Sequence, residues 1–436
     1  MTMLYLLLTI LTIEYIIGYR FLKDREIGAP SLILCVMMIA STALAIIGSK
    51  LYWQIDIHAN TVFYFSISVF LFLLSDLIIN FLYARKKRII IFKPKYINVD
   101  FSKLAVISMI GCLTLALQWK NVVSTVGLKS ISKMLFAYRT AYNAGDTEPQ
   151  SGLLSQLVLV TTISAYVFIY IFAYNFIYYR KKKKNYFNLI PVFILCVSGL
   201  LDGARGKLVN LVLSGVFFFY YFYQQKHGWK KKDNRKLAKK IAIIGVIGVI
   251  AFVRSGELLG RNQYDFGPMF EICEYAGGEI ILLDLFVNQK IPAPKGMWGQ
   301  STFENIYNYL GDHFGLEVKK LDLYTYRTSN NVPLGNVYTG LLPWYHDFGA
   351  IGIIVLSLIF GLVFSFWYRK LNRMDNEKRK TYWLLMYGYF INCLFLFLFN
   401  DRFFSRLGPQ LLRLFVYFWI IKVYIIDFRF VRETRS

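Results

Sequence analysis

The side chains best able to act on a ligand lie in one long polar stretch, from Arg254 to His346, and at its far boundary. Asp284 is a carboxylate inside an apolar run, where an unpaired charge is costly unless it faces a polar cavity. His346 and Asp347 place an imidazole and a carboxylate side by side at the start of the next apolar run. His346 could act as a base or as a hydrogen-bond donor, and Asp347 could equally be an N-cap. These three residues are candidate groups for proton transfer.

The same stretch has a composition that favours a sugar-bearing ligand. It is rich in Asn, Tyr, Trp, Asp and Glu, and it leads into Asn336, Tyr338 and Tyr345. Hydroxyl and amide side chains can hydrogen-bond to sugar hydroxyls. We therefore take these three residues as candidate substrate contacts.

Arginines recur near the ends of the apolar runs. Arg205 lies in a short turn between Gly203 and Gly206, which predicts an exposed guanidinium that could clamp a phosphate. The alternative is an interfacial arginine paired with Asp202. Planar guanidinium groups suit diphosphate oxygens, so we expect some further arginines to converge on one anion, although each could equally be an interface anchor. These are Arg139, Arg254, Arg261, Arg327, Arg402 and Arg406.

A metal or a nucleotide cofactor is not expected. The four histidines, at 58, 227, 313 and 346, are widely separated in the sequence. The polar stretch has no Asp-x-Asp pair of the kind that holds a divalent ion for a nucleotide sugar. Phosphate-loop and dinucleotide fingerprints are also absent from the sequence.

The chemical groups must be positioned by membrane-spanning helices. The chain has 436 residues, of which 56% are hydrophobic and 18% aromatic, and the apolar residues fall in runs long enough to cross a bilayer. We predict an all-α polytopic integral membrane protein with a single membrane domain over residues 1–436. Eleven spans are expected, at 2–18, 30–49, 60–83, 104–119, 153–179, 187–201, 208–223, 241–253, 347–368, 381–400 and 411–427.

The distribution of positive charge predicts the orientation of these spans. The sequence has 50 Lys and Arg against 26 Asp and Glu, and the basic residues concentrate in alternate loops such as 224–240 and 369–380. The positive-inside rule then places the amino terminus outside, the carboxyl terminus in the cytoplasm, and the loops 120–152 and 254–346 outside. Basic clusters spread over several short loops favour anionic lipid and argue against nucleic acid.

Both outer loops should contain helices. Apolar residues at helical intervals from Val122 to Tyr138 predict an interfacial helix. Residues 268–288 look helical with a bend at Gly277-Gly278, and 302–310 can form an amphipathic helix, whereas 321–334 should be loop.

Several segments together resemble the Wzy-type bacterial oligosaccharide repeat-unit polymerases, which build O-antigen and capsule chains. They span the second half of the chain, and their order and their expected placement on one membrane face carry the resemblance. The segments are Ala204-Arg205-Gly206, the stretch from Tyr275-Ala276-Gly277-Gly278 to Leu283-Asp284-Leu285-Phe286, Gly299-Gln300-Ser301-Thr302-Phe303, Asn336-Val337-Tyr338-Thr339, Asp347-Phe348-Gly349-Ala350-Ile351-Gly352 and Asn400-Asp401-Arg402-Phe403-Phe404.

The resemblance implies a glycosyl transfer at the outer face of the bacterial cytoplasmic membrane. A growing glycan on undecaprenyl diphosphate would move to a new lipid-linked repeat unit, and undecaprenyl diphosphate would leave without help from a metal. Arg205 becomes the leading candidate for diphosphate or sugar, followed by Arg254 and Arg261. Related lipid-linked glycan ligases carry a histidine near the position of Tyr338, where this chain has none. The base candidates, in order, are Asp347, then Asp284 and His346.

The resemblance also implies partners, and it leaves two alternatives. A chain-length regulator and a flippase would act with a polymerase. The alternatives are a lipid-linked glycan ligase, which uses the same donor with another acceptor, and a transporter or flippase of the lipid-linked oligosaccharide. A transporter often has paired interrupted helices in two halves, and the sequence has no such pairing.

Overall fold

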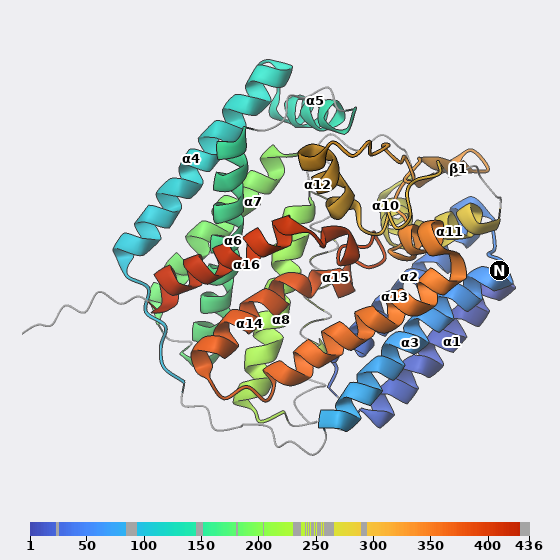
Figure 1. Ribbon diagram of the computed structural model, residues 1–436, viewed down its shortest axis with the longest axis horizontal. Helices are drawn as coiled ribbons and strands as arrows, with labels where there is room; N and C mark the ends of the chain where they lie inside the picture. The colour runs from blue at the N-terminus through green and yellow to red at the C-terminus, as the bar shows by residue number, and fades with distance from the viewer. Residues whose placement is uncertain are drawn as a thin grey trace, which may run out of the picture. The chain divides into compact units, whose positions relative to one another are not determined.

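The computed structural model is almost entirely helical (Figure 1). It describes residues 1–22, 26–83, 94–144, 151–179, 182–203, 205–229, 266–288 and 294–427, with scattered positions between 237 and 256. Within this part of the chain, 9 helices are long and apolar enough to cross a membrane. The chain is therefore a multi-pass helical membrane protein. The nine segments are Thr2–Phe21, Pro30–Trp53, Ala59–Tyr83, Phe101–Val126, Gly152–Tyr178, Lys183–Leu201, Gly206–Lys226, Leu341–Leu371 and Pro409–Asp427.

Two of the eleven expected spans are not among these nine. The span 241–253 lies largely outside the described residues. The span 381–400 forms two shorter helices, α14 (Glu377–Phe390) and α15 (Asn392–Phe395). The other expected spans match helices, although the one expected at 347–368 already begins at Leu341.

The chain forms two compact units, each assembled from three separate segments. Unit 1 comprises Met1–Ile89, Phe266–Met374 and Phe390–Arg413, and unit 2 comprises Ile90–Asp265, Asp375–Tyr389 and Leu414–Ser436. Because the segments of the two units alternate along the chain, no single linker in the sequence separates them.

Unit 1 is built around four long helices, α1, α2, α3 and α13, which run side by side (Figure 1). Small residues allow α3 and α13 to approach closely, because a Cβ at Gly361 would lie 2.8 Å from Ser75 Cβ. Ser68 Oγ and Ser357 Oγ are also 2.8 Å apart across the same pair. The elements of unit 1 are α1 (Thr2–Phe21), α2 (Pro30–Gly48), η1 (Ser49–Trp53), α3 (Ala59–Tyr83), α10 (Pro268–Ala276), α11 (Gly278–Asn288), α12 (Glu304–Phe314), β1 (Arg327–Ser329), β2 (Val332–Gly335), α13 (Leu341–Leu371), α15 and η3 (Phe404–Arg406).

The sequence predicts a loop at 321–334. Part of this segment instead forms the antiparallel hairpin β1–β2. Its two turn residues, Asn330 and Asn331, have φ of 50° and 61°. Asparagine tolerates this left-handed conformation, which two-residue hairpin turns require. The hairpin docks on the end of η1, since Asn330 Nδ2 donates to Trp53 O at 2.8 Å and Trp53 Nε1 donates to Pro333 O at 2.9 Å.

A break at Gly349 separates α13 into residues 341–348 and 350–371. Gly349 has φ 62° and ψ −149°, a conformation that is essentially restricted to glycine. The short first part carries Tyr345, His346 and Asp347, so the break sets their direction independently of the long second part.

A cluster of charged side chains is buried where α13 ends. We call Glu26, Ser31, Asp76, Tyr368 and Arg369 the Arg369 cluster. The Arg369 guanidinium lies 3.3 Å from an Asp76 oxygen and 3.9 Å from a Glu26 oxygen. Tyr368 donates to Glu26 at 2.6 Å and Ser31 donates to Asp76 at 2.7 Å. Mutual pairing allows these charges to be buried.

Unit 2 packs α6 against α4, α7 and α8. Close contacts here are aromatic, and a Cβ at Gly388 would lie 2.2 Å from the Phe218 ring. The segment predicted as an interfacial helix is divided between the end of α4, which includes Val122, and α5, whose Met134 and Tyr138 pack on Val122. The elements of unit 2 are α4 (Phe101–Val126), α5 (Ile131–Ala144), α6 (Gly152–Tyr178), η2 (Lys183–Leu189), α7 (Ile190–Leu201), α8 (Gly206–Lys226), most of α14, most of α16 (Pro409–Lys422), and η4 (Val423–Asp427).

Candidate functional site

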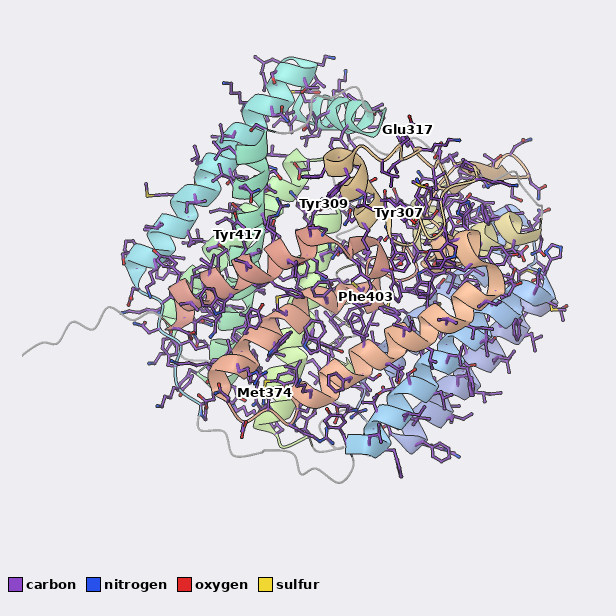
Figure 2. All side chains as sticks on the ribbon, in the orientation of Figure 1. Tyr307, Tyr309, Glu317, Met374, Phe403 and Tyr417 are labelled. Carbon is purple, nitrogen blue, oxygen red and sulfur yellow. The ribbon has the colours of Figure 1, made fainter. Side chains whose placement is uncertain are left out.

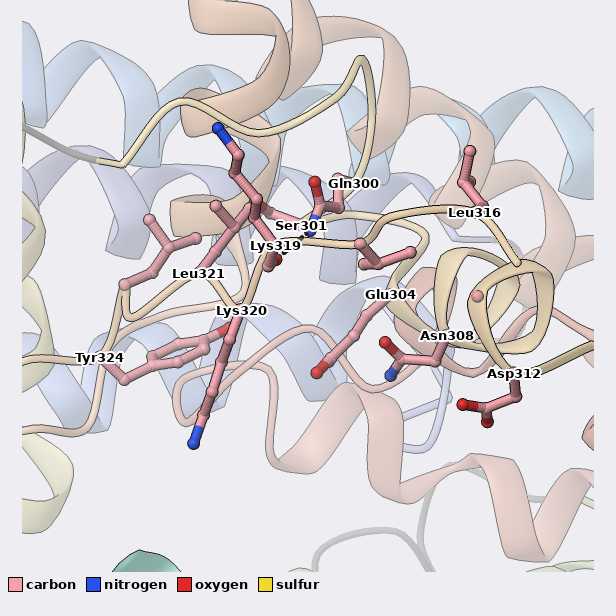
Figure 3. Close-up of a pocket in the computed structure, with 13 residues that line it drawn as sticks. Gln300, Ser301, Glu304, Asn308, Asp312, Leu316, Lys319, Lys320, Leu321 and Tyr324 are labelled. Atoms are coloured by element: carbon pink, nitrogen blue, oxygen red, sulfur yellow. Dashed lines mark hydrogen bonds between the residues drawn. The ribbon is translucent and has the colours of Figure 1, made fainter. Parts of the chain in front are cut away.

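A cleft of about 560 Å³ lies between α12 and the chain that follows it (Figure 3). We call it the α12 cleft. Its volume falls in the range of small-molecule sites, which is roughly 300–1,000 Å³. The whole cleft belongs to unit 1 and to the long polar stretch singled out from the sequence. Its polar lining comprises Gln300, Ser301, Glu304, Asn308, Asp312, Lys319, Lys320 and Tyr324.

One wall of the α12 cleft is a row of polar side chains on a helix. Glu304, Asn308 and Asp312 are four residues apart, which places them on one face of α12, as Figure 3 shows. The helix has no buried residue, and Tyr307 and Tyr309 project from it in Figure 2. In the described part of the chain, none of the three side chains forms a hydrogen bond or an ion pair. The wall is therefore open to an added ligand.

The opposite wall follows a glycine turn. Gly315 ends α12 with φ 69°, the left-handed C-cap that glycine adopts without strain. The chain then turns back, and residues 316–324 form the other side of the cleft, where the side chains of Lys319 and Lys320 extend away from the polar row of α12 (Figure 3).

Gln300 ties the two walls together. Its Nε2 donates to Lys319 O at 2.6 Å and its Oε1 accepts from Met297 N at 2.9 Å. Gln300 is 5% exposed, so these hydrogen bonds are shielded from water and hold the cleft in shape.

The formal charges that line the α12 cleft balance. Glu304 and Asp312 supply two carboxylates, and Lys319 and Lys320 supply two ammonium groups. Such a lining offers donors and acceptors to a hydroxyl-rich ligand, and Tyr324 offers a ring face. A diphosphate would meet two carboxylates here, so the cleft suits the glycan portion of a substrate better than its anionic portion.

His346 and Asp347 lie behind Ser301. His346 Nδ1 is 2.9 Å from Ser301 Oγ and 3.1 Å from Asp347 Oδ1, while its Nε2 is 3.1 Å from Pro294 O. The Asp347 carboxylate is 1% exposed and accepts from Thr302 N at 2.7 Å. The suggestion that Asp347 N-caps the following span is wrong, because α13 begins six residues earlier, at Leu341. Asp347 instead fixes the chain that leads into α12.

Asp284, the third candidate base, forms hydrogen bonds that join two helices. Its carboxylate is 1% exposed and accepts from His58 N at 2.7 Å and from Asn288 Nδ2 at 3.0 Å, and it pairs with His58 Nδ1 at 2.9 Å. His58 directly precedes α3, so Asp284 ties α11 to the start of that helix. Asp284 does not line the α12 cleft.

The structure brings Arg327 and Tyr338 together. Arg327 Nε donates to Tyr338 OH at 2.7 Å, and that hydroxyl donates to Thr325 O at 3.1 Å. Tyr338 is completely buried, whereas Asn336 is exposed. Tyr345 packs its ring on Tyr64, with centroids 5.3 Å apart. None of these predicted substrate contacts lines the α12 cleft.

Arg402 and Arg406 lie on a loop that packs beside the cleft. Arg406 ends η3, which contacts α12, and Arg402 Nε donates to Asn400 Oδ1 at 2.8 Å. Asp401 organises the loop by accepting from Trp344 Nε1 at 2.8 Å, from Phe403 N at 2.9 Å and from Phe404 N at 3.0 Å. Burial raises the pKa of Asp401 to about 6 despite these donors. Arg406 therefore lies on an element that contacts α12, and Arg402 lies just before that element.

Unit 2 contains the turn of Arg205. Arg205 is only 4% exposed, so the expectation of an exposed guanidinium is wrong. Asp202 pairs with Lys207 rather than with Arg205, and it accepts from Gln118 Nε2 at 2.8 Å. Gly203, with φ +61°, lies so close to α5 that a Cβ there would be 2.9 Å from Arg139 Cβ. The turn and Arg139 are therefore neighbours, and their packing is the reason that the turn is covered.

The last two predicted arginines are Arg254 and Arg261. Arg254 is exposed at an isolated described position, and Arg261 lies outside the described residues.

The residues that the sequence analysis missed are those of the cleft itself, above all Glu304, Asn308 and Asp312. The four-residue spacing of Glu304 and Asn308 on the helix predicted at 302–310 was a usable signal, and Asp312 continues that spacing beyond the predicted end.

The fold and the cleft together define a multi-pass helical membrane protein with a polar, charge-balanced cleft. Comparison with protein-family models, with curated proteins and with solved structures gave no match.

Proposed function

We propose that this chain is a membrane glycosyltransferase that polymerises undecaprenyl-diphosphate-linked oligosaccharide repeat units at the outer face of the bacterial cytoplasmic membrane. The observation that carries the proposal is the α12 cleft, which has the size and the balanced charge that suit a glycan. It lies in the polar stretch that the positive-inside rule assigns to the outside. The proposed topology has the amino terminus outside and the carboxyl terminus in the cytoplasm.

In this proposal the α12 cleft holds the sugar of the acceptor repeat unit. A hydroxyl of that sugar attacks the anomeric carbon of the donor glycan, and undecaprenyl diphosphate leaves. The step requires a base near the hydroxyl and positive charge near the departing diphosphate. His346 and Asp347 are the base candidates nearest to the cleft, because His346 contacts the cleft residue Ser301. Asp284 becomes a weaker candidate because its oxygens cap α3.

The positive charge for the leaving group is assigned to arginines. In unit 1, Arg402 and Arg406 are favoured, since their loop packs on α12. One charge-assisted hydrogen bond contributes about 1.5–3 kcal/mol, so two or three would account for much of the required stabilisation. In unit 2, Arg205 and Arg139 remain separate candidates for holding a lipid-linked diphosphate, and a chain-length regulator and a flippase remain proposed partners.

The test is a reconstituted lengthening reaction. Purified protein in detergent is given only labelled lipid-linked repeat units, and products are separated by size. The proposal predicts a ladder of longer glycans and released undecaprenyl diphosphate. A transporter would give no ladder, and a lipid-linked glycan ligase would give product only with a different acceptor. In cells, deletion should leave a single capped repeat unit in place of long chains, and an unchanged ladder would exclude the polymerase.

A further inference from the structure

Ser301 connects the α12 cleft to the two base candidates. Ser301 lines the cleft, whereas neither His346 nor Asp347 does. Its Oγ lies 2.9 Å from His346 Nδ1, within hydrogen-bond reach. A base behind the cleft wall can serve a ligand inside the cleft only through a group that touches both, and Ser301 is placed to do so.

The hydrogen bonds of His346 fix which nitrogen can take a proton. The Pro294 carbonyl, 3.1 Å from Nε2, can only accept, so this contact favours the neutral tautomer that carries its hydrogen on Nε2. In the neutral ring Nδ1 is then the acceptor, and the Ser301 hydroxyl can donate to it. Asp347 Oδ1, 3.1 Å from the same Nδ1, can accept a hydrogen from the ring only when the ring gains a second proton. Once Nδ1 carries the transferred proton, it can donate to Asp347 Oδ1.

The Asp347 side chain is buried and hydrogen-bonded beside His346. Its second oxygen accepts from Thr302 N at 2.7 Å, and its side chain is 1% exposed. The other charged groups near Ser301 are Glu304, Lys319 and Lys320 of the cleft lining. None of these three contacts the His346 ring in the described residues.

We propose that Ser301 relays a proton from the acceptor sugar hydroxyl to His346 Nδ1, an assignment that rests on the function proposed above. The acceptor oxygen forms a bond to the anomeric carbon of the donor, and the bond from that carbon to the diphosphate oxygen breaks, with its electron pair leaving on the diphosphate. The acceptor proton passes to Ser301 Oγ while the Ser301 proton passes to Nδ1. Asp347 then pairs with the imidazolium, which later releases its proton to water. Ser301 is the catalytic residue of this relay, and His346 and Asp347 act through it.

The relay is tested with purified Ser301→Ala, His346→Gln and the double variant in the lengthening reaction. Loss of acid–base assistance should lower kcat by about 100-fold in each single variant, with KM for the acceptor changed less than about twofold. Residues that act as one unit are not additive, so the double variant should be no slower than the slower single variant. Ser301→Thr keeps the hydroxyl and should retain most of the rate. Ser329→Ala removes a serine of β1 outside the cleft and serves as the matched control.

Each outcome of these experiments supports or contradicts the relay. An unchanged kcat in Ser301→Ala, or a double variant slowed by the product of the two single effects, would overturn it. Thermal melting checks folding, and if Ser301→Ala does not fold, the solvent deuterium isotope effect on kcat decides instead. Loss of that effect in His346→Gln supports the relay, and an unchanged effect contradicts it. If the wild-type protein itself makes no longer glycan, the proposed function fails; if it does and the variants match it, only the relay fails.

Discussion

The α12 cleft and the Arg369 cluster are both rich in charge, but their side chains are paired in opposite ways. In the cluster, Arg369, Asp76 and Glu26 are at most 2% exposed and bond to one another. In the cleft, Glu304 and Asp312 face open space and have no partner in the described residues. The charges of the Arg369 cluster are paired within the protein, whereas the two carboxylates of the cleft wall are left available to a ligand. The two regions should therefore respond differently to substitution.

The largest effect is expected for Arg369→Met. Removing the guanidinium leaves two buried carboxylates without their cation, which costs about 3–5 kcal/mol of unfolding free energy. Thermal melting in detergent should show a much lower midpoint and poor recovery of folded protein. Arg379→Met, at an exposed position, is the control and should melt like the wild type. An unshifted midpoint for Arg369→Met would mean that the cluster does not hold unit 1 together.

Glu279 should give a pH-dependent loss of stability. Its side chain is completely buried, and in the described residues only Ser41 bonds to it, at 2.6 Å. Burial raises the pKa of Glu279 from 4.5 to about 8, so the folded state holds the proton more tightly than the unfolded state. Unfolding free energy should then fall as pH rises from about 4.5 to about 8, by a few kcal/mol.

Glu279→Gln removes this titration and should flatten the pH dependence of the melting midpoint across that window. Glu317→Gln, at an exposed carboxylate, should leave the slope as it is in the wild type. Equal slopes for Glu279→Gln and the wild type would show that the carboxyl is not the titrating group.

Gly349→Ala tests the orientation of the candidate site, because it disturbs the backbone next to His346 and Asp347 without changing a charge. Nothing lies within 4 Å of an added Cβ, so the penalty comes from φ of +62° alone, about 1–3 kcal/mol. Because residues 341–348 carry His346 and Asp347, we expect a lower kcat along with a modest drop in melting midpoint. A fall in stability with full activity would mean that the break does not position the base.

The smallest effect is expected inside the cleft. Asp312→Asn removes one charge from the polar wall without disturbing a buried contact, since α12 has no buried residue. KM for the acceptor should rise several-fold, in line with about 1 kcal/mol for one hydrogen bond, with an unchanged melting midpoint. Asp322→Asn, an exposed carboxylate outside the cleft, is the control. Equal KM values for the two variants would remove Asp312 from the site.

The helical architecture could be predicted because its signal is local. Nine apolar runs of membrane-crossing length appear as helices in the described residues, and α5, α10, α11 and α12 arise near the predicted positions. The hairpin was missed although Asn330-Asn331 carries its turn signal. That pair was recognisable in principle, because few residues other than asparagine and glycine accept two successive positive φ angles.

The candidate site was only partly predictable because it depends on tertiary contacts. The proximity of His346 and Asp347 followed from adjacency, but their contact with Ser301, 45 residues away, did not. The α12 cleft needs the turn at Gly315 and the Gln300 cross-link to bring its walls together. The close approach of Gly203 to α5 depends on tertiary packing, which short-range sequence patterns do not encode.

The most direct test of the account is the lengthening reaction with a blocked cleft. Asn308→Trp should fill the α12 cleft from its exposed wall without disturbing the core, so the variant should melt like the wild type. The account predicts that wild-type protein extends lipid-linked repeat units into a ladder and that folded Asn308→Trp does not. Equal ladders from the two proteins would contradict the assignment of this cleft to the acceptor glycan.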